Sequence, residues 1–102
     1  MGEQPSQNTG PASRNVVVVR YWAAARAAAG IEQESVRVEG ETTLSALLDE
    51  VVSRHADRPR LKDVVGVCSV LVGDRPVGRA DPATVVLRPG DSIELLPPFA
   101  GG

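Results

Sequence analysis

Residues 42–52 read Thr42-Thr43-Leu44-Ser45-Ala46-Leu47-Leu48-Asp49-Glu50-Val51-Val52, and this stretch decides the fold. Its apolar side chains recur at the i, i+3, i+4, i+7 and i+8 positions, which places them on one face of an α-helix. They are Leu44, Leu47, Leu48, Val51 and Val52. The pattern predicts a long amphipathic helix that is N-capped by Thr42 or Thr43 and packs one face against a core.

The segments before this helix favour strand, short helix and strand. Val16–Tyr21 is β-branched and aromatic and is apolar on both faces, as an interior strand is. Trp22–Ala29 changes to strong helix formers and stops at Gly30, a suitable C-cap. Glu34–Glu39 alternates polar and apolar residues, which predicts a half-buried strand.

After the long helix, the pattern changes to short extended segments. We expect a short helical turn at Arg60–Val65, a strand at Cys68–Val72 and a return strand at Arg75–Val77. Val85–Leu87 is extended, and Ser92–Leu96 is the last strand. The whole order predicts an α+β fold in which a mixed four- to five-stranded sheet packs on one long helix.

A helix of this length covers only one face of such a sheet, yet the first strand is apolar on both. The open face is therefore expected to carry an exposed apolar patch of the kind that marks a partner surface. Alternatively, the short helices Trp22–Ala29 and Arg60–Val65 cover that face.

The composition excludes several classes of protein. A chain of 102 residues fits one domain, and a formal charge of −2 argues against nucleic-acid binding. There is one cysteine (Cys68), one histidine (His55) and one lysine (Lys62), so a disulfide framework and a cysteine-rich zinc site are excluded. Cys68 is interpreted as a small buried hydrophobe, and the sequence indicates no acid–base partner near His55. Ordinary side-chain catalysis is therefore not expected.

The two ends of the chain differ from the middle. Met1–Asn15 is almost without apolar residues and is interpreted as a flexible tail that precedes a domain at residues 16–96. The longest apolar runs, Val16–Val19 and Tyr21–Ala25, are far too short to span a membrane, and Met1–Arg14 lacks the basic start and the apolar stretch of a signal peptide. We therefore expect a soluble, cytoplasmic protein that binds neither membranes nor nucleic acids.

The last six residues carry the main indication of function. They are Pro97, Pro98, Phe99, Ala100, Gly101 and Gly102. Two prolines stiffen the exit from the last strand, and six extended residues reach roughly 20 Å, enough to enter another protein's active site. Two terminal glycines pass through a channel that any Cβ would block.

A terminal carboxylate becomes reactive when ATP adenylates it. Attack by a sulfur nucleophile on the adenylate gives a thiocarboxylate, whereas attack by a lysine amine gives an isopeptide bond. In both cases the reacting group is the main-chain carboxyl of Gly102, which suits a chain with so few reactive side chains. The alternative is a Gly-Gly end without any role.

Two parts of the chain resemble the small subunits of molybdopterin synthase, which are ubiquitin-like sulfur carriers of the β-grasp fold. Val19-Arg20-Tyr21-Trp22-Ala23 and the following Ala25–Gly30 resemble their opening strand and helix. Arg88-Pro89-Gly90-Asp91 and Leu95–Gly102 resemble their closing turn, strand and tail. The resemblance covers Asn15 to Gly102, and Pro-Pro-x-x-Gly-Gly is its most specific part. The N-terminal extension and the alanine-rich first helix depart from the family pattern.

The resemblance implies a pathway. An E1-like activating enzyme would use ATP to adenylate Gly102, and a sulfur donor would convert it to a thiocarboxylate. The tail would then enter the large synthase subunit, in a heterotetramer, and deliver sulfur to precursor Z. Gly101 would fit the channel, and Phe99 would anchor the arm. Pro97, Pro98 and Ala100 would line the arm, and the chain would bind no metal or cofactor and would not be an enzyme alone.

Other functions share these features. A sibling sulfur carrier for thiazole or cysteine synthesis would have the same fold and the same Gly-Gly end. A ubiquitin-like modifier of target lysines, or a β-grasp interaction module without terminal chemistry, belongs to a different class. Because Lys62 is the only lysine, self-chains through several lysines are impossible, although single conjugation stays open.

Overall fold

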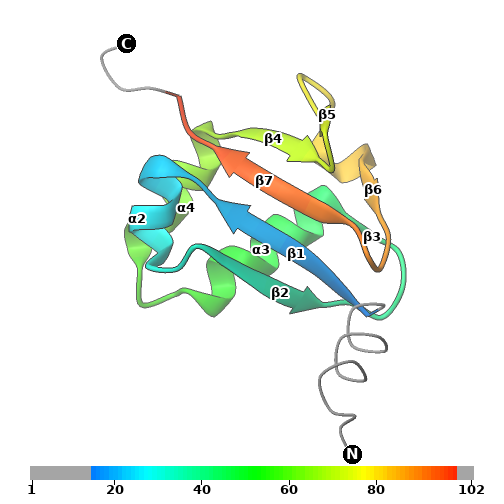
Figure 1. Ribbon diagram of the computed structural model, residues 1–102, viewed down its shortest axis with the longest axis horizontal. Coiled ribbons are helices and arrows are strands. Elements are labelled where there is room, and N and C mark those ends of the chain that lie inside the picture. The colour runs from blue at the N-terminus through cyan, green and yellow to red at the C-terminus, as the bar shows by residue number, and fades with distance from the viewer. Residues whose placement is uncertain (1–14, 99–102) are drawn as a thin grey trace, which may run out of the picture.

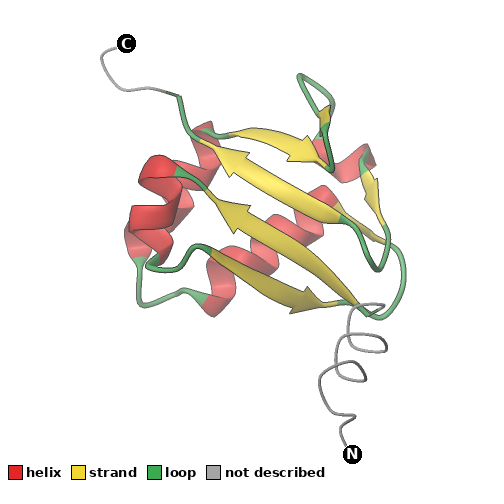
Figure 2. Cartoon of the chain, viewed as in Figure 1, coloured by secondary structure: helices red, strands yellow, loops and turns green. Residues whose placement is uncertain are grey.

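A five-stranded mixed β-sheet with helices on one of its faces dominates the structure, a computed structural model that describes residues 15–98 (Figures 1 and 2). In chain order the elements are β1 (Val16–Tyr21), α2 (Ala23–Ala29), β2 (Gln33–Arg37), β3 (Thr42–Thr43), α3 (Leu44–Arg54), α4 (Pro59–Val67), β4 (Ser69–Val72), β5 (Arg75–Pro76), the 3-10 helix η1 (Pro82–Thr84), β6 (Val86–Leu87) and β7 (Ser92–Leu96). The expected α+β class, with a mixed sheet on one long helix, is confirmed.

The strand order is β2-β1-β7-β4-β5, so the last strand of the chain lies in the middle of the sheet. β1 is antiparallel to β2 and parallel to β7, with Val19 opposite Ile93, while β4 is antiparallel to β7. Strands β3 and β6 form a separate two-stranded ladder beside the N-terminus of α3.

The long helix forms where the apolar stripe predicts it. Thr43 is its N-cap, and the Thr43 hydroxyl oxygen accepts a hydrogen bond from the Ala46 backbone N–H at 3.1 Å. The stripe residues Leu44, Leu47 and Val51 are buried against the sheet. Burial of this kind contributes about 1.5–3 kcal/mol for each large aliphatic side chain.

The short helix α2 also agrees with the sequence, with Trp22 as its N-cap and Gly30 as its C-cap. Gly30 has φ 81°, and its backbone N–H donates to the Arg26 carbonyl at 2.8 Å. Only glycine adopts this left-handed conformation without strain.

Several element boundaries differ from the prediction. The helical turn expected at Arg60–Val65 is a helix of nine residues that begins at Pro59 and ends at Val67. Proline at the first position of a helix costs no hydrogen bond, which is why the helix begins there. Cys68 is the C-cap of this helix rather than the first residue of a strand, and the second strand is Gln33–Arg37 rather than Glu34–Glu39.

A single core lies between the sheet and the helices. Its fully buried members come from β1, β2, β6 and β7 and from the helices α2, α3 and α4, so α2 and α4 share the core face with α3. They include Val17, Val19, Tyr21, Ala25, Ala29, Val36, Leu44, Leu47, Val51, Leu61, Leu87, Ile93 and Leu95. The alternative that the short helices cover the opposite face is wrong, and Figure 1 shows no helix across the front of the sheet.

The open face carries less apolar surface than expected. The register places Val16, Val18 and Arg20 on this face, opposite the core residues Val17 and Val19. Val16 and Val18 are half-buried and Arg20 is exposed. The predicted apolar patch is therefore a strip of partly covered aliphatic side chains that lies among polar ones.

Candidate functional site

The arm expected to carry the chemistry leaves the sheet from its central strand. β7 is hydrogen-bonded to β1 on one side and to β4 on the other, and it ends at Leu96. Pro97 is half-buried and Pro98 is exposed, so the described part of the arm passes from the sheet into solvent within two residues. Phe99, Ala100, Gly101 and Gly102 lie outside the described residues, and their roles stay predictions.

The turn before β7 fixes how this strand meets β1. The Arg88 N–H donates to the Asp91 carboxylate at 2.8 Å, and the Asp91 N–H donates to the Arg88 carbonyl at 3.0 Å. Between them Gly90 has φ 97°, and its N–H donates to the Val16 carbonyl at 2.8 Å. The Arg-Pro-Gly-Asp turn therefore sets the parallel register of β7, and with it the point at which the arm begins.

An exposed tryptophan lies beside the base of the arm. The Trp22 backbone N–H donates to the Leu95 carbonyl at 3.2 Å, which ties this residue to the end of β7. Its indole Nε1–H donates to Glu94 Oε1 at 2.9 Å, and the Arg20 guanidinium lies 5.6 Å from the ring centroid. The Trp22 side chain is held in place although 43% of the residue is exposed. An ordered aromatic ring with a polar handle is typical of a partner-binding anchor.

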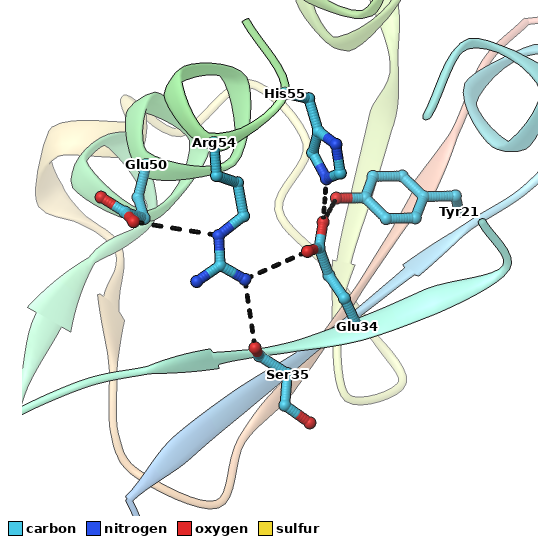
Figure 3. A network of polar contacts seen from close by, with 6 residues as sticks. All are labelled: Tyr21, Glu34, Ser35, Glu50, Arg54 and His55. Atoms are coloured by element: carbon cyan, nitrogen blue, oxygen red, sulfur yellow. Dashed lines mark hydrogen bonds and ion pairs between the residues drawn. The ribbon is translucent and has the colours of Figure 1, made fainter. Parts of the chain in front are cut away.

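A second polar group joins the edge strand to the end of the long helix (Figure 3). The Glu34 carboxylate accepts hydrogen bonds from the Tyr21 hydroxyl, from Arg54 Nη1 at 3.0 Å and from the His55 ring at 2.6 Å. Arg54 Nη1 also donates to the Ser35 carbonyl at 3.2 Å. Only 13% of the Glu34 side chain and 15% of the His55 side chain are exposed. Donors from β1 and α3 thus converge on one carboxylate of β2.

These contacts shift two pKa values in opposite directions. Burial by itself raises the pKa of the Glu34 carboxyl, but the hydrogen bonds from Tyr21, His55 and Arg54 outweigh it, so that the pKa is lowered. The pKa of the Tyr21 hydroxyl is raised, first by burial and then by its hydrogen bond to Glu34. Glu34 is therefore held ionised and Tyr21 neutral, which suits a structural clamp rather than an acid–base pair.

No partner of His55 could be identified from the sequence because Glu34 lies 21 residues earlier in the chain. The alternation of the strand did contain a signal for this contact. Glu34 lies two and four residues before Val36 and Val38, so its side chain is on the same core-facing side of the strand. A carboxylate at an inward position needs donors, and Tyr21 and His55 supply them. The cluster could have been sought on that ground.

The single cysteine, Cys68, is poorly suited to act as a nucleophile. Cys68 is half-buried against the core, and burial raises the pKa of its thiol to about 11. A thiol with that pKa is a poor nucleophile at neutral pH. Among residues 15–98, no group of three or more His, Cys, Asp or Glu side chains could hold a metal ion. In the same part of the chain, every helix is too short or too polar to cross a membrane.

Comparison with known proteins places this geometry in a family. The sequence profile described as the ThiS family matches residues 19–102, a range that includes the second half of β1, the arm and the Gly-Gly end. The human molybdopterin synthase sulfur carrier subunit is 34% identical over 86 residues, covering 84% of this chain and 93% of that protein.

Solved structures agree on the fold. SAMP1 from Haloferax volcanii, a small archaeal modifier protein, has a TM-score of 0.69 at 24% identity, covering 85% of this chain and 99% of the other. A chain from the complex of subunits 1 and 2 of the molybdopterin-converting factor from Helicobacter pylori has a TM-score of 0.56 at 26% identity, with coverage of 85% and 99%. The expected ubiquitin-like β-grasp fold is confirmed. The chain belongs to the ThiS family, and within it the chain is similar to the molybdopterin synthase sulfur carrier subunits.

Proposed function

We propose that this protein is a sulfur carrier of molybdopterin synthase, and that its Gly102 carboxyl is the group that carries the sulfur. The observation that carries the proposal is the position of the arm. The Pro-Pro-x-x-Gly-Gly end follows directly from the central strand β7 in a chain 34% identical to a carrier subunit of this name. Among the side chains, Cys68 and the Glu34 cluster offer no competing centre.

The proposed chemistry takes place on the main chain. A Gly102 carboxylate oxygen attacks the α-phosphorus of ATP on an E1-like activating enzyme, and pyrophosphate leaves. Sulfur at the oxidation level of sulfide then attacks the carbonyl carbon, AMP leaves with the bonding electrons, and a thiocarboxylate remains. That thiocarboxylate donates its sulfur to precursor Z. In this proposal the β-grasp domain is the part that the partner enzymes bind, and it supplies no side chain to the reaction.

The proposed receiving partner is the large subunit of molybdopterin synthase, in a heterotetramer. The similarity to one subunit of the two-subunit Helicobacter pylori complex supports a large-subunit partner of this kind. Trp22 and its neighbours Arg20 and Glu94 lie beside the base of the arm, and we assign them the role of gripping the partner's surface around the channel entrance. The likeness to SAMP1 concerns the fold alone and does not favour a modifier function.

Deletion of Gly102 tests the proposal. The full chain and the deleted chain are incubated with ATP, the activating enzyme, a sulfur source and the large subunit, and sulfur transfer and the mass of the C-terminal peptide are measured. We expect replacement of one oxygen by sulfur at Gly102 of the full chain, and neither this mass change nor transfer for the deleted chain. Cys68→Ala, which removes the only thiol, is the matched control and should retain both.

The outcomes separate the alternatives. Transfer by the deleted chain would contradict the carrier function. A thiocarboxylate that is transferred only when a thiazole synthase or a cysteine synthase replaces the large subunit would assign the chain to a sibling pathway. An isopeptide bond to a lysine of another protein, without sulfur at Gly102, would identify a modifier.

A further inference from the structure

The strand β2 lies at the edge of the sheet, and no other strand within residues 15–98 pairs with its outer side (Figure 1). The Tyr21 N–H donates to the Glu32 carbonyl, and the Val38 N–H donates to the Asn15 carbonyl, at 2.9 and 2.8 Å. In an antiparallel ladder, hydrogen-bonded and non-hydrogen-bonded pairs alternate. Since Glu32 and Val38 both bond to β1, the register makes Glu34 and Val36 the other residues whose backbone groups bond to β1. The backbone N–H and C=O groups of the alternate residues Gln33, Ser35 and Arg37 point away from β1. An edge of this kind can pair with another chain.

Only part of this edge is closed. Arg54 reaches around it from α3, and its Nη1 donates to the Ser35 carbonyl at 3.2 Å. The outward-facing groups of Arg37 lie farther along the strand, toward β3. Within the part of the chain that the structure describes, Arg54 therefore covers the middle of the strand edge, and no contact of this kind covers its C-terminal end.

A groove of about 540 Å³ adjoins this open end, between the chain from β2 to β3 and the first turns of α3. Its floor is formed by Val36, Val38 and Leu47, which are buried. Its charged lining residues are three carboxylates and one guanidinium, namely Glu39, Glu41, Glu50 and Arg37. The groove thus combines an apolar floor with an acidic rim.

Two of the rim carboxylates have cationic neighbours outside the groove. Arg88 Nε lies 3.1 Å from Glu41, and Arg54 Nε lies 3.9 Å from Glu50. In both pairs at least one side chain is more than half exposed to solvent. Surface ion pairs of this kind contribute little, so an incoming cation can replace them at small cost.

We propose that this groove binds an extended, basic segment of a partner protein, which adds itself as a further strand to β2. The partner's backbone would pair with the outward groups of Arg37 and its neighbours, as in other cases of strand addition. Lysine or arginine side chains at alternate positions would face α3, with their aliphatic stems over Leu47 and their charged ends at Glu39 and Glu50. Apolar side chains between them would continue the strip that contains Val16 and Val18.

The site is separate from the carrier chemistry. In the sheet, β1 lies between β2 and the arm-bearing strand β7, so a peptide on the free edge leaves the arm accessible. Failure of this proposal would leave the carrier function untouched, and failure of the carrier function would leave this groove untouched.

The test uses the isotope-labelled full chain and a capped probe peptide, Lys-Val-Lys-Val-Lys, with amide chemical shifts as the readout. We expect shifts confined to residues 33–41 and to the first turns of α3. Glu50→Gln should weaken binding about three- to tenfold, because it removes one charge-assisted contact. The matched control Glu32→Gln, which changes the same residue type outside the groove, should leave the affinity unchanged. A probe that is N-methylated at alternate residues keeps every charge but cannot pair with the strand, and it should bind at least about tenfold more weakly.

Several results would overturn the proposal. They are the absence of shifts, shifts on the open sheet face or at Trp22, and equal binding of Glu-Val-Glu-Val-Glu or of the N-methylated probe. Shifts at residues 33–41 that depend on protein concentration without peptide would assign the edge to a second copy of this chain. Tighter binding of a peptide corresponding to residues 1–14 would assign it to the chain's own N-terminal segment.

Discussion

The His55 Nε2 atom lies 2.6 Å from Glu34 Oε2 and joins the C-cap of the long helix to the edge strand of the sheet. Tyr21 and Arg54 bind the same carboxylate (Figure 3). The cluster therefore links β1, β2 and α3 through one anionic group. Its removal leaves partly buried donors without an acceptor, which is costly.

Glu34→Gln is expected to lower the free energy of unfolding by about 2–3 kcal/mol, because the amide keeps the shape but loses the charge that three donors share. Urea denaturation measures the change. Glu32→Gln is the matched control, since the Glu32 side chain is 68% exposed and its 3.7 Å pair with Arg26 lies on the surface. This control should change the free energy by at most about 0.5 kcal/mol. Equal losses in the two variants would show that the cluster does not stabilise the fold.

The same cluster predicts how stability depends on pH. The pKa of Glu34 is lowered from its ordinary value of 4.5, so its contribution is present above pH 4.5 and is lost as the pH falls through the folded-state pKa. The pKa of Tyr21 is raised from 10.0, so its contribution is present below pH 10 and is lost as the pH rises further. We expect a stability plateau between these two values in urea midpoints measured across the pH range.

Two variants separate the limbs of that profile. Glu34→Gln should flatten the acid limb, and Tyr21→Phe should flatten the alkaline limb. A profile that the two variants leave unchanged would assign the pH dependence to other groups.

Trp22→Ala and Leu47→Ala should separate partner binding from stability. Leu47 is 2% exposed, and its truncation should cost about 2–5 kcal/mol of unfolding free energy. Trp22 is 43% exposed and lies outside the core, so its truncation should cost about 1 kcal/mol or less and should instead weaken binding to the large subunit by at least about tenfold. Calorimetric titration with the large subunit and urea denaturation give the two quantities. Unchanged affinity of Trp22→Ala would remove this residue from the proposed interface.

Two glycines offer a matched pair of substitutions. Gly30→Ala forces a side chain into φ 81° and puts its Cβ 2.6 Å from the Arg58 guanidinium, so we expect a loss of about 1 kcal/mol while Arg58 moves aside. Gly66→Ala lies inside α4 with nothing within 4 Å of the new Cβ and should raise stability by about 0.5–1 kcal/mol. Thermal unfolding of both variants checks the two signs, and a stabilised Gly30→Ala would contradict the left-handed cap.

The single thiol provides a further check. Because burial raises the pKa of the Cys68 thiol to about 11, iodoacetamide at neutral pH should modify Cys68 much more slowly than a free thiol with the ordinary pKa of 9.0. Unfolding in urea should restore the ordinary rate. Rapid alkylation of the folded protein would instead show a solvent-accessible thiolate.

The fold was predictable where a local sequence pattern is compatible with only one type of secondary structure. The stripe that begins at Leu44 could only form a helix with one buried face, and Val16–Tyr21 could only form an interior strand. The extent of α4 was missed because Gly66 and three β-branched valines weaken its helical signal, while Pro59 marks a helix start that reads equally well as a turn. The β3–β6 ladder consists of two residues per strand and has no pattern of its own.

Of the candidate site, the sequence alone could indicate only the run of consecutive residues at the end of the chain. The Gly-Gly end can be recognised in the sequence because the proposed chemistry depends on residue order alone, and its role stays a prediction. The Glu34 cluster and the Trp22–Glu94 contact depend on how distant segments meet, over 21 and 72 residues. Those contacts follow from the strand order, which places β7 in the middle of the sheet.

That strand order also has a mechanical consequence. An arm drawn into a partner's channel transmits tension to Leu96, and β7 shares this load between the ladder to β1 and the ladder to β4. The pull acts along the strand, so several hydrogen bonds on each side must break together before β7 moves. A terminus on an edge strand would peel away from a single neighbour. If the chain has the proposed carrier function, this arrangement keeps the domain folded each time an enzyme pulls on its last residues.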